Sequence, residues 1–174
     1  MRVLIVTPLY PPEVADAAVY AKELAKRLAK RHEVTVVAYT RLPEQIPGVT
    51  VITIDKRQPR LSRLYAFRKA FENAIRDADI AFAVNGASVE LPIALASRPK
   101  SVPLVFCLAD TAAHARAGII ERLAFGRARA IVRDLPLPRP EILPLEPIPE
   151  TALAAYEASW ETHLKALDSL FPHV

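Results

Sequence analysis

Polar side chains follow three of the predicted strands at the points where those strands end. Asp16 comes after the first strand and its proline-rich loop, and Asn85 and Asp110 come directly after two later strands. In open parallel sheets the carboxyl ends of the strands form the edge where ligands bind. A strand, a loop and a helix N-terminus at that edge are a common place for a phosphate. We therefore expect a cleft lined by Tyr10, Asp16, Asn85, Gly86 and Asp110.

Each of these polar side chains also has a simpler role open to it. Asp16 can cap the helix that follows, because an aspartate side chain accepts hydrogen bonds from the free N–H groups of a helix start. Asn85 and Asp110 can bond to the backbone of their own loops. The sequence favours the cap for Asp16 and leaves both roles open for the other two.

The histidines and the cysteine do not have the spacing of a catalytic or metal site. His114 and His163 lie on predicted helices without a partner at metal-ligand spacing. His32 suits a helix end, where an imidazolium complements the dipole, and His173 is next to the terminus. Cys107 lies within an apolar run, which predicts an inert core thiol. We predict no catalytic residue, no metal site and no cofactor.

Short apolar runs alternate with helical patterns along the first three quarters of the chain. The predicted strands span 2–7, 33–39, 49–54, 79–84, 103–108 and 128–132. The predicted helices span 17–30, a segment from Pro59 to Asp77, 89–97 and 112–125. This alternation predicts a three-layer, Rossmann-like α/β domain with a mostly parallel sheet. We expect six or seven strands in the order 3-2-1-4-5-6.

The composition changes after Arg133, which predicts three segments. Residues 1–134 form the α/β domain, and residues 135–149 form an extended linker stiffened by prolines, with a short strand end at 142–145. Residues 150–174 contain a final helix whose apolar stripe must be buried against something. The stripe consists of Leu153, Tyr156, Trp160, Leu164, Leu167 and Phe171.

Bulk composition describes an ordinary folded domain. Hydrophobic residues make up 52% of the 174 residues and charged residues 24%, which excludes a disordered chain. No apolar run reaches the length of about 18 residues that a membrane-spanning helix needs. The N-terminus lacks the features of a signal peptide, and a single cysteine fits a reducing compartment. We expect a cytoplasmic protein.

A basic cluster is the main feature of the charge distribution, within a net charge of +4. Such a cluster is usually a solvated helix face, but it leaves open a weak, peripheral contact with an anionic membrane. Tyr65, Phe67 and Phe71 interleave with it at helix-packing rather than base-stacking positions, so we expect no nucleic-acid binding. The cluster consists of Lys56, Arg57, Arg60, Arg63, Arg68 and Lys69.

Two segments carry a resemblance to a known family. Residues 10–14 (YPPEV) and 31–37 (RHEVTVV) resemble the start of retaining GT-B glycosyltransferases, the group 1 or family 4-like enzymes built from two Rossmann-like domains. Those chains open with a strand, Tyr-Pro-Pro-x-x-Gly-Gly, a helix and Gly-His-Glu-Val-Thr-Val. The resemblance continues to residues 128–132, and residues 159–161 (SWE) are similar to the start of a last helix that returns to pack on the first domain. It implies the N-terminal, acceptor-side domain plus that helix.

The chain departs from the family at the positions that face the sugar donor. Between Pro147 and Glu150 there is no counterpart of the second domain, which in the family binds the nucleotide and carries a pair of glutamates. Ala15 and Asp16 replace the two glycines, so that a Cβ and a carboxylate oppose a diphosphate. Ala109 stands where the family often has a histidine reaching toward the donor sugar, although the acid that follows is kept.

The resemblance therefore implies a glycosyltransferase-like domain without transfer activity on its own, because transfer requires the charge of the leaving group to be stabilised. A second chain would supply the nucleotide-sugar-binding domain, or two copies would form a homodimer. The alternatives are a pseudoenzyme that acts as a binding, regulatory or dimerisation module, and a truncated or engineered fragment of a full enzyme. Few amides and 16 prolines point to a thermophilic source.

Overall fold

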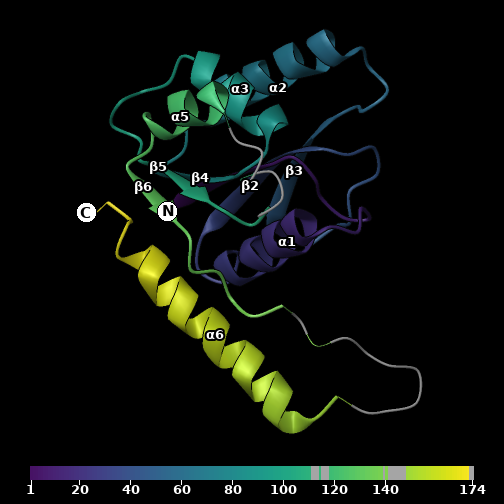
Figure 1. Ribbon diagram of the computed structural model, residues 1–174, viewed down its shortest axis with the longest axis vertical. Helices are drawn as coiled ribbons and strands as arrows, with labels where there is room; N and C mark the ends of the chain where they lie inside the picture. The colour runs from purple at the N-terminus through teal and green to yellow at the C-terminus, as the bar shows by residue number, and fades with distance from the viewer. Residues whose placement is uncertain (111–113, 115–117, 139, 141–147, 173–174) are drawn as a thin grey trace. The chain divides into compact units, whose positions relative to one another are not determined.

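The computed structural model describes residues 1–110, 114, 118–138, 140 and 148–172 (Figure 1). These residues divide into two compact units, 1–133 and 134–172, and each unit is described by itself. Within the described residues, no helix combines the length and apolar character needed to cross a membrane.

The first unit is built on an open parallel sheet of six strands in the order β3-β2-β1-β4-β5-β6. The strand order reverses between β1 and β4, and such a reversal opens a crevice at the carboxyl ends of the strands. The predicted sheet, its order and its parallel pairing are confirmed. The strands are β1 (Arg2–Thr7), β2 (Glu33–Tyr39), β3 (Val49–Ile54), β4 (Ile80–Val84), β5 (Leu104–Cys107) and β6 (Ala130–Val132).

Helices cover both faces of this sheet, which gives the three layers. Figure 1 shows α2, α3 and α5 along one face and α1 on the other. The first part of the predicted helix 112–125, apart from His114, and the predicted strand end 142–145 lie outside the described residues. The helices of this unit are α1 (Asp16–Leu28), α2 (Arg60–Ala74), α3 (Ala87–Leu95) and α5 (Ile119–Phe125).

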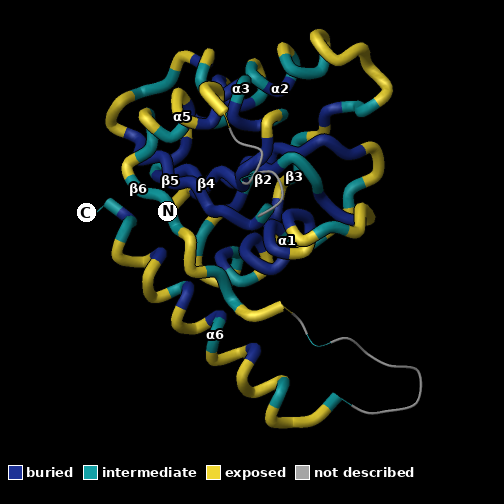
Figure 2. The backbone as a smooth tube through the Cα atoms, viewed as in Figure 1, coloured by how far each residue is buried: buried dark blue, intermediate teal, exposed yellow. Residues whose placement is uncertain are grey.

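One part of the core lies between the sheet and the three helices on one face. Phe67 and Phe71 of α2 and Ile93 of α3 pack against alternate side chains of the strands, such as Leu4 and Phe106. Figure 2 shows the central strands in dark blue because they are buried on both sides. Unbroken apolar runs such as residues 3–6 predict this double burial.

Of the three aromatic residues expected at helix-packing positions of α2, Phe67 and Phe71 lie in the core and Tyr65 does not. Leu61 and Tyr65 are 81% and 61% exposed, whereas Phe67 and Phe71 are fully buried. With about 3.6 residues per turn, Tyr65 lies nearly opposite Phe67 on the helix. The apolar residues of α2 form two stripes, and the sheet takes only the one that carries the phenylalanines.

The second unit consists of α6 (Glu150–Asp168) and the extended segment before it. The backbone N–H of Leu137 donates to Ser159 Oγ at 3.0 Å, and His163 Nδ1 lies 3.0 Å from the carbonyl oxygen of Asp134. The ring of Trp160 makes edge contacts with the rings of Tyr156 and His163. The final helix predicted from residue 150 is therefore confirmed.

Candidate functional site

The loops after β1 and β4 meet at the carboxyl edge of the sheet. Gly86, which follows β4, has a φ of +143°, a conformation that side chains with a Cβ rarely adopt. A Cβ on Gly86 would also lie 3.2 Å from Cγ of Pro8, which follows β1. Glycine is therefore required here for both its backbone freedom and its small size, and the two loops are held close together.

The loops after β4 and β5 are joined by the side chain of Asn85. Its Nδ2 donates to the carbonyl oxygen of Asp110 at 2.6 Å, and its Oδ1 accepts from the N–H of Asp110 at 2.8 Å. Asn85 is fully buried. The sequence left open that Asn85 bonds to the backbone of its own loop. Its amide does bond to backbone, but to the loop after β5, and it thereby clasps the ends of β4 and β5 together.

Asp16 does not cap α1, contrary to the expectation favoured by the sequence. The N-cap is Ala15, whose carbonyl oxygen accepts from the N–H groups of Ala18 and Val19, and no side chain caps this described helix start. The helix begins one residue earlier than predicted, so Asp16 is exposed in its first turn. A carboxylate there interacts with the helix dipole instead of accepting a capping hydrogen bond.

The side chain of Tyr10 is fully buried beside the same edge. Burial, with a smaller contribution from the charge of Glu44, raises the pKa of its phenol to about 12. Its hydroxyl has no hydrogen-bond partner within the described part of the chain. Tyr10 therefore supports the loop from within.

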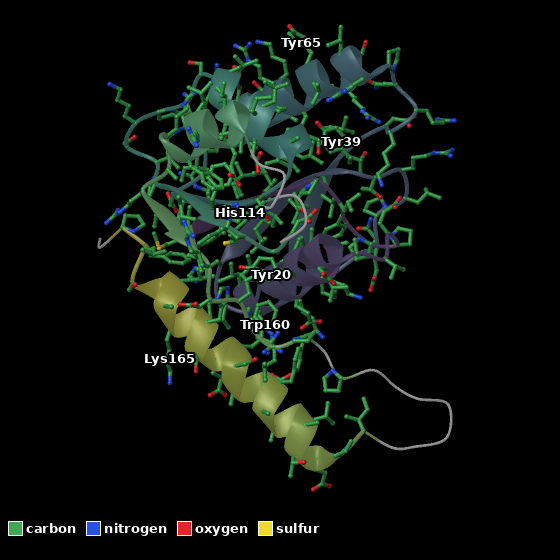
Figure 3. All side chains as sticks on the ribbon, viewed as in Figure 1. Tyr20, Tyr39, Tyr65, His114, Trp160 and Lys165 are labelled. Carbon is green, nitrogen blue, oxygen red and sulfur yellow. The ribbon has the colours of Figure 1, made fainter. Side chains whose placement is uncertain are left out.

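An imidazole and two buried carboxyls lie next to this edge, and their proximity was not predicted from the sequence. Figure 3 labels His114. Its Nδ1 lies 2.6 Å from Glu121 Oε1 on α5, and its backbone N–H donates to the carbonyl oxygen of Asp110 at 3.1 Å. Glu90 of α3 is buried and accepts from the N–H of Gly86 at 2.9 Å. His114 precedes α5, whose N-cap Gly118 is extended, so helical spacing does not predict this pair.

The charges of these groups act on one another. Burial is the main cause that raises the pKa of Glu90, while the N–H of Gly86 opposes the rise. The negative charges of Glu121 and Asp110 raise this pKa further, and His114 lowers it. The carboxyl of Glu90 therefore lies within the electrostatic influence of Glu121, Asp110 and His114.

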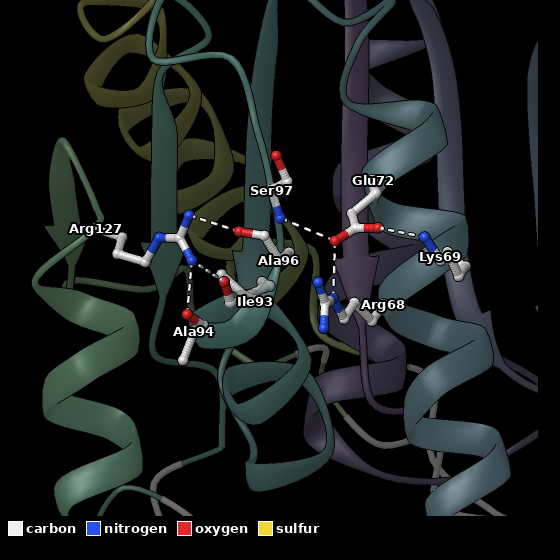
Figure 4. A network of polar contacts seen from close by, with 8 residues as sticks. All are labelled: Arg68, Lys69, Glu72, Ile93, Ala94, Ala96, Ser97 and Arg127. Atoms are coloured by element: carbon white, nitrogen blue, oxygen red, sulfur yellow. Dashed lines mark hydrogen bonds and ion pairs between the residues drawn. The ribbon is translucent and has the colours of Figure 1, made fainter.

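Two side chains, Arg127 and Glu72, bind backbone groups at and just after the C-terminal end of α3 (Figure 4). They hold in place the helix whose first turn follows Gly86 and contains Glu90. The guanidinium of Arg127 donates to the carbonyl oxygens of Ile93, Ala94 and Ala96 at 2.9, 2.6 and 2.7 Å. The last carbonyls of a helix lack the usual partner four residues on, and of these three the Ile93 oxygen also accepts from the N–H of Ala96 at 3.2 Å. The carboxylate of Glu72 on α2 accepts from the N–H of Ser97 at 2.9 Å.

Most of the basic cluster on and before α2 is engaged with neighbouring groups. Lys56 pairs with Glu13 at 2.6 Å, Arg57 with Asp55 at 2.8 Å and Arg68 with Glu72 at 2.8 Å. The guanidinium of Arg63 donates to the carbonyl oxygen of Lys56, and Arg60 is exposed. These pairs reduce the net positive charge that the cluster presents.

The described residues contain no group of three or more His, Cys, Asp or Glu side chains that could hold a metal ion. Cys107 is fully buried and close to Tyr20 of α1. Burial raises the pKa of its thiol to about 12, and an unreactive core thiol results.

Comparison with known proteins gives one family. The family model described as Glycosyltransferase Family 4 matches residues 17–134, more than half of the chain. A search of curated proteins found no match. Among solved structures, the C-terminal domain of the coenzyme A biosynthesis bifunctional protein CoaBC is similar with a TM-score of 0.48 and 12% identity, over 96% of each chain.

Proposed function

The chain belongs to glycosyltransferase family 4, and we propose that it serves as an acceptor-side domain, which binds the molecule that receives a sugar. The observation that carries this proposal is the clasped edge formed by Pro8, Gly86, Asn85 and Asp110. Open α/β sheets bind their ligands at this edge, beside the point where the strand order reverses. Here that point lies between β1 and β4.

We further propose that this chain does not transfer a sugar by itself. The start of α1, where a diphosphate would meet free N–H groups, carries the methyl group of Ala15 and the exposed carboxylate of Asp16. A negative charge in that turn repels a diphosphate, and a leaving group that is not held receives no stabilisation. A nucleotide-sugar-binding domain supplied by a second chain would complete the enzyme.

A non-catalytic dimerisation module is the second candidate. Four large apolar side chains, Leu95 of α3 and Ile119, Ile120 and Leu123 of α5, are exposed on neighbouring helices. Where exposed apolar side chains of adjacent helices form one patch, that patch is often an interaction surface. A homodimer in solution that Leu123→Glu separates into monomers would favour this candidate.

Calorimetric titration with UDP, GDP and their sugar conjugates tests the proposal of inactivity. We expect no binding tighter than about 100 μM to the natural chain. The double variant Ala15→Gly and Asp16→Gly should bind a nucleotide diphosphate more tightly, because it removes both the obstruction and the charge. Val14→Gly is the matched control, since it loosens the same exposed loop and leaves the carboxylate in place.

Two further results test the proposed inactivity and the proposed acceptor-side role. Binding of a nucleotide sugar to the natural chain more tightly than about 100 μM would contradict the proposed inactivity. Purification from the native source in a complex with a second Rossmann-like chain would support the acceptor-side role, whereas a clean monomer would count against it.

A further inference from the structure

His114 and Glu121 form a pair whose geometry defines the state of the imidazole ring. Glu121 Oε1 lies 2.6 Å from His114 Nδ1, and the glutamate side chain is only 8% exposed. An ionised carboxylate has acceptors and no donor, so the proton of a neutral ring in this contact is on Nδ1. The other ring nitrogen, Nε2, then has a free lone pair.

The free nitrogen is accessible, and the ring that carries it is held in place. The side chain of His114 is 38% exposed, and no described residue bonds to its Nε2. Its ring stacks on Phe125 with centroids 6.4 Å apart. Its backbone N–H donates to the carbonyl oxygen of Asp110, the same oxygen that Asn85 binds. The clasp at the strand ends thus also positions the imidazole.

The charges around the ring select the ligand. Glu121 contacts the ring of His114, and the carboxyl of Glu90 interacts electrostatically with His114, Glu121 and Asp110. A phosphate or carboxylate ligand would be repelled by this set, whereas an uncharged hydroxyl group can donate to the Nε2 lone pair. Hydroxyl groups are also what a sugar acceptor presents.

We propose that His114, oriented by Glu121, accepts a hydrogen bond from a hydroxyl group of an uncharged, sugar-like ligand at the carboxyl edge of the sheet. This assigns His114 as a binding residue and Glu121 as its positioning residue. The proposal rests on the proposed acceptor-side function, because it names the atom that would hold the acceptor.

Nitrogen-15 NMR of the full chain, labelled at its 4 histidines, tests the ring and its ligand together. Long-range proton–nitrogen spectra report which ring nitrogen carries the proton, and His114→Gln identifies the His114 signals. We expect the Nδ1–H tautomer in the natural chain and its loss in Glu121→Ala. Backbone amide spectra of each variant verify that it remains folded.

The probes are the methyl glycosides of glucose, galactose and mannose, with inorganic phosphate as the charged comparison. At least one glycoside should shift the Nε2 signal of His114 with saturation, and its affinity should fall at least tenfold in Glu121→Ala. His163 is the internal control, because its Nδ1 also lies near an oxygen acceptor, the carbonyl of Asp134. Its signals should not move.

Three outcomes would overturn the proposal. These are the Nε2–H tautomer in the natural chain, a saturable shift with phosphate but with no glycoside, and glycoside binding that is unchanged in Glu121→Ala. Failure of the proposed function is distinguishable from failure of this site. If glycosides shift the His114 signals and the chain also binds nucleotide sugars tightly, only the proposed inactivity is contradicted. If the chain forms a complex with a donor-domain chain but no glycoside shifts the His114 signals, only the proposed binding site is contradicted.

Discussion

Glu72 and Glu90 are both buried glutamates, and their surroundings move their pKa values in opposite directions. The N–H of Ser97 and then the guanidinium of Arg68 lower the pKa of Glu72 to about 2, with a smaller contribution from Lys69. For Glu90 burial dominates and raises the pKa, because its one hydrogen bond from Gly86 does not compensate for the loss of water. The two residues therefore contribute to stability in different pH ranges.

Glu72→Gln should lower the free energy of unfolding by about 1–3 kcal/mol near pH 7, since the amide keeps at most part of the charged contacts. The folded pKa lies below the ordinary value of 4.5, so the contribution is present above pH 4.5 and is lost as the pH falls toward about 2. Urea unfolding between pH 2 and 7 should show this loss in the natural chain and not in the variant. Glu161→Gln, on an exposed carboxyl, is the control. Equal pH dependence in Glu72→Gln and the natural chain would contradict the assignment.

Glu90→Gln should have the opposite pH signature. The folded pKa is raised above 4.5, so ionisation of Glu90 costs stability progressively as the pH rises above that value. An amide oxygen can still accept from the N–H of Gly86 without that cost. The variant should thus gain stability relative to the natural chain as the pH rises above 4.5. Glu90→Ala, which loses the hydrogen bond, should be less stable than Glu90→Gln, and the reverse order would refute the explanation.

For single residues, the sequence predicted which of them follow the strands at the carboxyl edge of the sheet, but not the contacts that they make there. Asn85, Gly86 and Asp110 could be placed because each directly follows an apolar strand. The pairing of His114 with Glu121 depends on how α5 approaches the loop after β5, and no local pattern encodes that approach. The predicted N-cap of α1 was wrong by one residue. Ala15, and not Asp16, is the N-cap, and no side chain accepts a capping hydrogen bond there.

Arg127 shows how one side chain fixes a whole element. It donates to three carbonyl oxygens at the C-terminal end of α3 and thereby joins that helix to the turn after α5. Hydrogen bonds from charged donors are stronger than neutral ones, and all three carbonyls would lose this charged donor without Arg127. The same helix begins at the clasped edge, so its position affects the site.

Arg127→Ala should lower the free energy of unfolding by about 2–4 kcal/mol, as expected when several charge-assisted hydrogen bonds are lost together. Arg127→Lys should recover only part of the loss, because an ammonium group lacks the planar fork that reaches the three oxygens. Arg122→Ala on the exposed side of α5 is the matched control and should have little effect. Denaturant unfolding measures all three, and equal stability of the Arg127→Ala and Arg122→Ala variants would contradict this role.

The strands were predictable because short apolar runs that alternate with helical patterns are typical of the buried strands of an α/β domain. The buried face of α2 was not, because its sequence offers two apolar stripes and only the sheet decides between them. The apparent basic patch likewise resolved into pairs whose acidic partners, such as Glu13 and Asp55, lie in neighbouring loops. Periodicity identifies an element, and its partners decide which face is buried.

At the scale of the whole molecule, the two faces of the sheet are covered unequally in the first unit. Among its described helices only α1 lies on the face opposite α2, α3 and α5, and it packs on β1 and β2 (Figure 1). Side chains alternate between the two faces along a strand. Ala83 and Phe106 belong to the core beneath α2, α3 and α5, so their neighbours Phe82 and Val105 point to the face that carries α1. Parallel sheets of this type are covered on both faces. We propose that the apolar stripe of α6 provides this cover.

Removal of α6 tests the proposal. A chain that ends at Arg133 should bind the dye ANS and unfold at a lower urea concentration than the full chain, because apolar strand surface would be exposed to water. Within the full chain, Leu167→Ala should lower the free energy of unfolding by about 2–5 kcal/mol if Leu167 is packed in a core. Lys165→Ala, a change on the exposed side of the same helix (Figure 3), should leave it within about 0.5 kcal/mol. An unfolding midpoint that is unchanged by the truncation, together with equal stability of the two α6 variants, would mean that the helix does not cover the sheet and that its stripe serves a partner molecule instead.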